Sequence, residues 1–270
     1  MTVIELVIGT LLLIVCILTI QFSFLIPRKK GLPVLMYHKI LQTHPDGLTV
    51  TADQFDHQLM YLKEKGYQTI QFKALKNLIK DGAPLPKKTI ILTFDDAYLN
   101  FFEQALPLLN KYNFTATVFV PVAFMGKTNI WDQGADVLMT ADKLKQLALQ
   151  HGIEIALHSF LHKSYGDLAI TDMEEDLNNC RQTLEFYGVP YSKVLAYPYG
   201  GYPKKDPELK RQMISLFKQF GLDFALRIGN QINPWPILQP FEIKRIDIKG
   251  TDSFFIFRTK LTKGRAKLFA

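Results

Sequence analysis

Seven short apolar runs, rich in β-branched and aromatic residues, constrain the fold of this chain more than any other feature of its sequence. They lie at residues 32–37, 89–94, 115–122, 153–157, 194–197, 224–226 and 243–248. Because the runs are nearly continuous and do not alternate with polar residues, they are typical of parallel strands buried on both faces. Parallel strands need long crossover connections, so the pattern predicts an α/β protein.

Amphipathic stretches separate these runs, at residues 52–65, 75–81, 100–112, 141–151, 171–187 and 207–220. Thr51 is the predicted N-cap of the first helix, a capping box is predicted at 171–174, and Gly188 is placed to end its helix. The alternation leaves two architectures open, a closed barrel and an open doubly wound sheet. In both, functional residues lie at the carboxyl ends of the strands.

Residues 6–26 contain no charged side chain and have the length that a helix needs to cross about 30 Å of hydrocarbon. Glu5 precedes the segment and no small-residue cleavage site follows it, which favours an uncleaved anchor over a signal peptide. We therefore expect an anchor with its basic flank at 1–30 and one catalytic domain at 31–270. The flank, at residues 28–30, would keep that domain in the cytoplasm by the positive-inside rule.

Composition limits the chemistry in two ways. The only cysteines are Cys16 and Cys180, which excludes a disulfide framework and a four-thiolate zinc site, so any metal must be held by histidine and carboxylate. The formal net charge of +7 favours an anionic partner. The basic residues are scattered and do not form a stripe with aromatic residues, so we expect no nucleic-acid partner.

Two polar motifs follow predicted strands. Asp95 and Asp96 end the run 89–94, where two carboxylates are tolerated only if a cation faces them, unless one caps a helix and the other is solvated. His158 and His162 follow the run 153–157, and their spacing predicts two imidazoles on one side of a helical turn. Each motif alone is weak. Together they offer two histidines and one aspartate, a set that leaves coordination positions open for water and substrate.

Two other strand ends carry weaker signals. His38 ends the first run, at the same end of the sheet as the motifs above. Residues 198–201 read PYGG, a turn whose glycines let the backbone approach a ligand, although a plain tight turn explains them equally well. His44, His57 and His151 fall in predicted loops or helices and are assigned no role.

Taken in order, TFDD at 93–96, HSFLH at 158–162 and AYPYG at 196–200 resemble the motifs of the NodB-type polysaccharide deacetylases of carbohydrate esterase family four. The resemblance covers roughly residues 32–250. The opening LPVLMYHKI and the late KRIDI are most similar to the IcaB-like branch, the poly-N-acetylglucosamine N-deacetylases of biofilm systems. The resemblance implies a distorted (β/α)7 barrel, here preceded by one N-terminal transmembrane helix, and metal-dependent hydrolysis of N-acetyl groups.

The same resemblance implies roles for individual residues. Asp95 would be the general base, and Asp96, His158 and His162 would bind one divalent ion, with zinc the first choice and cobalt or nickel as alternatives. The ion would acidify a water, from which Asp95 takes a proton. The backbone N–H of Tyr199 would stabilise the tetrahedral oxyanion.

Substrate contacts are expected from three residues, Trp131, Pro198 and Tyr199. The Trp131 indole would lie under a sugar ring, with ordinary loop packing as an equally open interpretation.

Two departures from the family pattern affect the predicted mechanism. Ala196 stands where many members have an arginine that orients the base; Arg245 is a candidate replacement, although a surface salt bridge is the favoured interpretation of that residue. No histidine follows His162, so the late histidine that serves as general acid is missing, and Asp247 occupies the nearest equivalent position. We predict that His38 acts as the general acid or orients it.

The sequence thus predicts a hydrolase of non-peptide carbon–nitrogen bonds that removes acetyl groups from an N-acetylglucosamine polysaccharide of the cell surface or matrix. A deacetylase of peptidoglycan, chitin oligosaccharide or xylan remains open, because loops determine the substrate. A non-catalytic glycan-binding or scaffold protein is the alternative of another class. Against the basic flank, the resemblance favours a single-pass protein of the cell membrane with an extracellular catalytic domain; its protein partners are not predicted.

Overall fold

The computed structural model describes residues 2–21, 27–132 and 135–266. Its strands are β1 (Val34–Tyr37), β2 (Lys39–Leu41), β3 (Thr49–Thr51), β4 (Gln68–Thr69), β5 (Thr89–Phe94), β6 (Ala116–Val120), β7 (Ile153–Leu157), β8 (Val194–Ala196), β9 (Phe224–Ile228) and β10 (Ile243–Asp247). Its helices are α1 (Val3–Gln21), α2 (Ala52–Glu64), α3 (Phe72–Lys80), α4 (Leu106–Tyr112), α5 (Ala141–Ala148), α6 (Ile170–Tyr187), α7 (Pro207–Phe220) and α8 (Phe254–Lys263).

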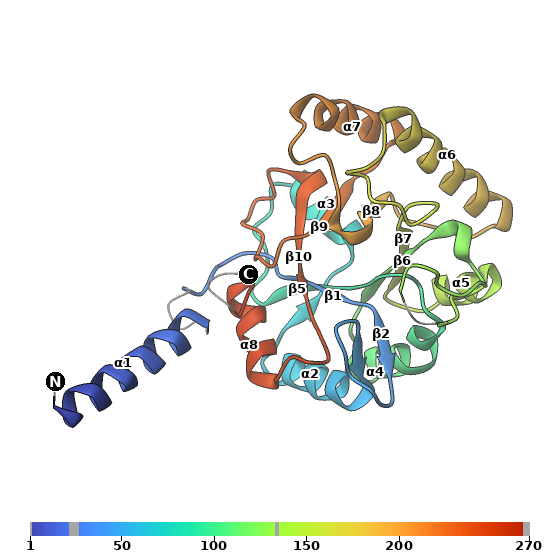
Figure 1. Cartoon of the computed structure of the whole chain (residues 1–270). Helices are drawn as coiled ribbons and strands as arrows, with labels where there is room; N and C mark the ends of the chain where they lie inside the picture. Colours follow the sequence, from blue (N-terminus) through green and yellow to red (C-terminus); the bar gives the residue numbers. More distant parts are fainter. Residues whose placement is uncertain (1, 22–26, 133–134, 267–270) are drawn as a thin grey trace.

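Seven parallel strands form a closed barrel at the centre of the molecule, and helices surround it (Figure 1). The order around the barrel is β1, β10, β9, β8, β7, β6 and β5, and β5 pairs with β1 to close the ring. Strand β4 pairs with β5 outside the ring, and β2 pairs with β3 in a separate small sheet. The sequence pattern allowed either a closed barrel or an open doubly wound sheet. The closed ring excludes the open sheet and confirms the expected (β/α)7 barrel.

The seven barrel strands are the seven apolar runs of the sequence, with ends that differ by at most two residues. Their inward side chains form one apolar cluster inside the barrel, which Phe72 and Leu75 of α3 complete. Their outward side chains, such as Leu35 and Leu92, belong to a second cluster that includes Phe55 and Leu59 of α2. Burial on both faces explains why the runs do not alternate with polar residues.

Most helix ends follow the sequence signals. The Thr51 hydroxyl accepts a hydrogen bond from the Gln54 N–H, and the Gln54 side chain accepts one from the Thr51 N–H, so α2 begins with a capping box. Gly188 ends α6 in the left-handed conformation, as predicted. The capping box predicted at 171–174 is wrong, because α6 already begins at Ile170.

Helix α1 covers the described part of the predicted membrane segment, and residues 22–26 of that segment lie outside the described residues. Within the described part of the chain, no helix is long and apolar enough to cross a membrane. This finding corrects the predictions of a transmembrane helix and of a single-pass cell-membrane protein with an extracellular catalytic domain.

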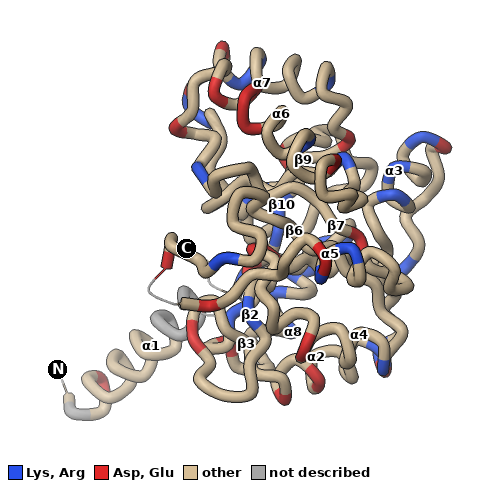
Figure 2. Tube along the Cα trace, turned by 90° about the vertical axis from the view of Figure 1, so that its right-hand side faces the viewer, with Lys and Arg blue, Asp and Glu red and all other residues tan. Residues whose placement is uncertain are grey.

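Charged side chains are distributed over many elements. Figure 2 shows Lys and Arg on helices as far apart as α3, α4 and α7, with Asp and Glu among them. On α7, for example, Glu208 and Arg211 form an ion pair of 2.7 Å. The positive net charge is therefore spread over the chain and is not concentrated on one helix.

Candidate active site

The polar residues of the sequence motifs meet at the carboxyl ends of the barrel strands. His38 follows β1, Asp95 and Asp96 follow β5, and His158 follows β7. With His162 and residues from neighbouring loops, they line a cavity of about 310 Å³. The barrel thus brings together side chains from distant parts of the sequence at the end of the sheet where α/β proteins carry their functional residues.

Two consecutive carboxylates face this one cavity. Side chains alternate between the faces of a strand, so Asp95 continues the inward set that includes Ile91, and Asp96 would be expected to point outward. Asp96 and Ala97 instead adopt the left-handed conformation, with φ angles of 69° and 52°, and the Asp96 side chain reaches the cavity. Both carboxylates are 3% exposed. A left-handed backbone at non-glycine residues is costly and persists only where the surrounding structure imposes it.

The loop that carries the two histidines is not helical, so the predicted helical turn at 158–162 is wrong. Ser159 and His162 have left-handed backbone angles, with φ of 62° and 55°, which prevents a helix. The imidazoles of His158 and His162 are nevertheless adjacent, with ring centroids 4.9 Å apart. The spacing of the two histidines therefore predicted correctly that their rings are close, but it predicted the wrong backbone conformation.

The cation that the carboxylates require is Arg245 on β10. Its guanidinium donates two hydrogen bonds to Asp95, from Nη1 to Oδ1 at 2.5 Å and from Nη2 to Oδ2 at 2.7 Å. The Arg245 side chain is 1% exposed and also lies over the Phe119 ring. A surface salt bridge, the interpretation that the sequence favoured for Arg245, is therefore wrong: the pair is buried inside the barrel.

The charge of Asp95 is stabilised by its neighbours. Burial alone would raise the pKa of Asp95, but the positive charge of Arg245 and the hydrogen bonds from its guanidinium outweigh burial and hold this pKa below its ordinary value. Asp95 is therefore ionised at neutral pH.

Asp96, His158 and His162 form a buried group whose ligand atoms all lie within 4.8 Å of one another. Asp96 Oδ1 lies 3.5 Å from Nε2 of His158 and 3.2 Å from Nε2 of His162. Among the described residues, this oxygen has no hydrogen-bond partner although it is buried. An unsatisfied carboxylate oxygen between two imidazole nitrogens fits a divalent cation, which would bind all three atoms.

The hydrogen bonds of the imidazoles orient these ligand atoms. Nδ1 of His158 donates to the Ala196 carbonyl at 2.8 Å, which leaves the Nε2 lone pair directed at Asp96. Nδ1 of His162 lies 3.1 Å from the Tyr199 hydroxyl, which can accept a hydrogen bond from it. Burial lowers the pKa of His158 to about 4, so its ring is neutral at physiological pH, the state that binds metals.

Three comparisons with known proteins agree with this arrangement. Residues 82–215 match the family model described as polysaccharide deacetylase. This range identifies a polysaccharide deacetylase domain in the chain. The matched range contains the deacetylase motifs at Asp95, Asp96, His158 and His162, whereas His38 and Arg245 lie outside it.

The matches with curated relatives cover part of the chain. The Bacillus subtilis (strain 168) protein YxkH is 28% identical over 63% of this chain, and the poly-beta-1,6-N-acetyl-D-glucosamine N-deacetylase of Staphylococcus aureus is 26% identical over 56% of it. The enzyme of that name from Escherichia coli (strain K12) is 24% identical over 59% of this chain. The matches span 57%, 54% and 27% of those relatives' own lengths.

Solved structures share the fold. IcaB from Ammonifex degensii matches with a TM-score of 0.72 and 18% identity, covering 88% of this chain and 99% of that one. The Streptococcus pyogenes deacetylase PplD matches with a TM-score of 0.70 and 22% identity, covering 86% of this chain and 98% of that one. At these identities the likeness concerns the fold of the deacetylase barrel.

Trp131, expected to contact sugar, contacts the candidate metal-binding group of Asp96, His158 and His162. Its indole Nε1 donates to Asp96 Oδ2 at 3.3 Å, and its ring stacks on His162 with centroids 4.1 Å apart. One face of the indole is therefore covered by protein, while the residue still lines the cavity.

The remaining predicted residues surround the same cavity. His38 lines it, with Nε2 3.9 Å from Asp95 Oδ2. Tyr199 also lines it, with 60% of its surface exposed and a left-handed φ of 57°. Pro198 is buried next to Tyr199.

Sequence reasoning did not identify Lys39, whose ammonium group lies 3.1 Å from Asp132 and 2.6 Å from Asp136. A lysine at the end of an apolar run is unremarkable in a sequence, and its partners are more than ninety residues away. In the structure, Arg245 lies two residues after the inward-facing Ile243 in the same strand, so it also faces inward.

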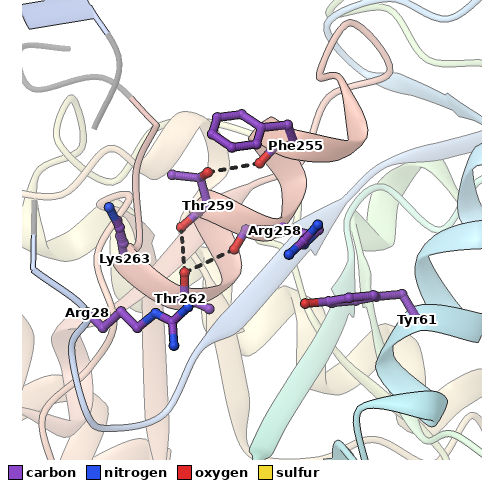
Figure 3. A pocket seen from close by; sticks show the side chains of 7 residues that line it. All are labelled: Arg28, Tyr61, Phe255, Arg258, Thr259, Thr262 and Lys263. Atoms are coloured by element: carbon purple, nitrogen blue, oxygen red, sulfur yellow. Dashed lines mark hydrogen bonds between the residues drawn. The ribbon is translucent and has the colours of Figure 1, made fainter. Parts of the chain in front are cut away.

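A second cavity, of about 200 Å³, lies on α8 (Figure 3). Three of its lining side chains are cationic, those of Arg28, Arg258 and Lys263, and none of its described lining residues is a carboxylate or an imidazole. Figure 3 shows that the hydroxyls of Thr259 and Thr262 donate hydrogen bonds to backbone carbonyls of their own helix. These residues offer no base and no metal-binding group, so this cavity is not a candidate site for metal-dependent hydrolysis.

Proposed function

We propose that residues 31–270 form a catalytic domain that hydrolyses N-acetyl groups from N-acetylglucosamine units of a polysaccharide, with Asp95 as general base and Asp96, His158 and His162 as ligands of one divalent ion. The observation that carries this proposal is the buried, unsatisfied Oδ1 of Asp96 between two imidazole nitrogens, beside an ionised Asp95.

A divalent cation, zinc first and cobalt or nickel as alternatives, would lower the pKa of a bound water and polarise the acetyl oxygen. The donor set supports such an ion because two imidazoles and one carboxylate leave coordination positions open. The ligands are already oriented by the Ala196 carbonyl and the Tyr199 hydroxyl.

Asp95 takes the proton of the attacking water in this proposal. Arg245 binds both of its oxygens, which fixes the plane of the carboxylate and keeps it ionised. Arg245 therefore takes the place of the arginine that many family members carry at the position of Ala196. A carboxylate with a lowered pKa is a weak base, so it can accept a proton only from a water that has been acidified.

His38 is the proposed donor of a proton to the leaving amine. Its side chain is 15% exposed and lines the cavity, so it can reach substrate. Its buried Nδ1 has no hydrogen-bond partner within the described ranges. Asp247, at the position of the missing late histidine, is paired with Lys249 at 3.4 Å. His38→Ala should slow turnover strongly while the bound metal, measured by elemental analysis, stays unchanged; turnover at the wild-type rate would exclude this role.

The substrate side of the cavity is proposed from Trp131, Pro198 and Tyr199. The Tyr199 backbone N–H would stabilise the oxyanion, and its exposed ring would contact the sugar. The names of the relatives from Staphylococcus aureus and Escherichia coli support an N-acetylglucosamine polymer with β-1,6 linkages.

The direct test is acetate release from a panel of substrates: β-1,6- and β-1,4-linked N-acetylglucosamine oligomers, peptidoglycan fragments and acetylated xylan. We expect release from the β-1,6 oligomer and little from xylan, with Asp95→Asn as the inactive control. Release only from another member of the panel would change the substrate. No release from any substrate by metal-loaded protein would contradict catalysis and favour a glycan-binding role.

A further inference from the structure

We infer that Lys39 is a positioning residue for the metal-binding group: it holds the segment around Trp131 so that the indole supports Asp96 and His162. The inference rests on the proposed metal site and concerns a residue two steps away from it. Lys39 does not line the catalytic cavity and would act entirely through its partners.

Lys39 carries a buried charge with two partners. The residue is 6% exposed, and its Nζ lies 2.6 Å from Asp136 Oδ2 and 3.1 Å from Asp132 Oδ2. Burial alone would lower the pKa of Lys39, but the hydrogen bonds to Asp136 and Asp132 outweigh burial and raise it. The ammonium group also lies over the Tyr98 ring, 5.0 Å from its centroid. A buried cation with these partners fixes the position of both aspartates, because leaving it unpaired would be costly.

The two aspartates follow Trp131 in the chain and belong to one hydrogen-bonded group with Asn129, which precedes it. Asn129 donates from its side chain to Asp132 and accepts a hydrogen bond from the Asp136 N–H. Asn129 itself is 3% exposed. Lys39, at the start of β2 and directly after His38, therefore anchors the chain that follows Trp131 through the two aspartates. It anchors the chain that precedes Trp131 through Asn129.

Trp131 connects the segment that Lys39 holds to two of the proposed metal ligands, Asp96 and His162. Its N–H occupies Oδ2 of Asp96, which leaves Oδ1 as the atom that faces the imidazoles. Its ring stacks on His162 at 4.1 Å and meets the edge of Phe124 at 5.0 Å. Partners of metal ligands typically change metal affinity about 10- to 100-fold when they are lost. Displacement of Trp131 should therefore weaken metal binding.

The chain offers a clean reporter for this displacement. It contains two tryptophans, and Trp235 does not line the catalytic cavity. In a Trp235→Phe background, the fluorescence of Trp131 reports its own surroundings, and paramagnetic Co²⁺ at the proposed site should quench it. Co²⁺ titrations would be compared for this parent, Lys39→Met, Lys39→Arg, Asp136→Asn and the control Lys111→Met. The control removes an exposed ion pair, with Asp56, that lies outside the site.

We expect Lys39→Met to shift Trp131 emission to longer wavelength and to weaken Co²⁺ binding about tenfold. Lys39→Arg should recover part of the affinity, Asp136→Asn should lose about threefold, and Lys111→Met should match the parent. If Lys39→Met does not fold, Asp136→Asn decides, because that side chain is 28% exposed and Lys39 keeps Asp132 as a partner.

Unchanged emission and unchanged Co²⁺ affinity in folded Lys39→Met or Asp136→Asn would overturn the inference. A loss of stability alone would do the same, since an ion pair with only a structural role alters neither reading. A parent that binds no Co²⁺ would overturn the metal site of the proposed function, which separates that failure from the failure of the inference.

Discussion

The two ends of the barrel each bury carboxylates, but they treat them differently. At the amino end, Glu154 of β7 accepts four hydrogen bonds, from the N–H groups of Phe72 and Lys73 and from the hydroxyls of Thr117 and Ser192. The two N–H groups belong to the start of α3, where a negative charge is favourable. Glu154 thus joins α3 to the barrel and is satisfied by neutral partners.

At the carboxyl end, the carboxylates are less completely satisfied. Asp96 accepts one hydrogen bond, from Trp131, and its other oxygen faces two imidazoles without a hydrogen bond from any described residue. Asp95 depends on the charge of Arg245. A buried carboxylate with neutral hydrogen-bond donors on both oxygens indicates a structural role. A buried carboxylate with an unsatisfied oxygen among imidazoles indicates a metal-binding or catalytic role. Variants at the two ends should therefore affect different properties.

The largest effect is expected from Asp95→Asn. The amide cannot accept the proton of water, so kcat should fall about 10³-fold, equivalent to about 4 kcal/mol of transition-state stabilisation. Acetate release at saturating substrate measures this. Retention of more than about a tenth of the wild-type kcat would exclude Asp95 as the base.

At the opposite end, Glu154→Ala should lower the free energy of unfolding by about 3 kcal/mol, because it leaves buried donors without an acceptor. Urea unfolding measures the loss. The kcat of the folded variant should stay within about twofold of wild type. A strong loss of kcat with unchanged stability would remove the distinction between the two ends.

The metal-free protein should lose stability on acidification because of His158. Its pKa is lowered to about 4 by burial, so between the ordinary histidine value and pH 4 the unfolded chain binds a proton that the folded chain does not. The contribution of His158 to the free energy of unfolding should therefore fall by about 3 kcal/mol from pH 6.5 to pH 4. Urea unfolding across this range should show a flatter profile for His158→Gln than for wild type; equal slopes would contradict this assignment.

The smallest of these effects is expected from Arg245→Lys. Lysine keeps a positive charge but not the two parallel hydrogen bonds that fix the Asp95 carboxylate. We expect kcat to fall about tenfold, or about 1.4 kcal/mol. An unchanged kcat would mean that charge alone is sufficient at this position.

The barrel could be predicted from the sequence because each of its strands is buried on both faces and leaves an apolar run. Strands β2, β3 and β4 could not be predicted, because a strand of two or three residues is too short to show a hydrophobic pattern in the sequence. The ligand set was visible because Asp96, His158 and His162 stand directly after or close to strand ends. The backbone conformation of these residues was not visible in the sequence. The left-handed angles at Asp96 and His162 depart from the alternation of a strand and from the geometry of a helix.

Residues that act through distant partners were hidden for another reason. The ion pair of Lys39 with Asp136 depends on two loops that meet only in the folded chain. Arg245 was visible as a residue but was assigned to the surface, because the runs are apolar on both faces and so do not show which face lies inside the barrel. Its partner, Asp95, is 150 residues away in the sequence.

Metal titration of the stripped protein tests most directly whether the carboxyl end of the barrel is a metal-dependent deacetylase. Acetate release from an N-acetylglucosamine oligomer would be measured after chelation and then after stepwise addition of Zn²⁺, with bound metal quantified at each step. We predict negligible release without metal and a linear rise that ends at one equivalent, with no rise in His162→Ala. Full release by the stripped protein, or no release with one equivalent bound, would contradict the proposed chemistry.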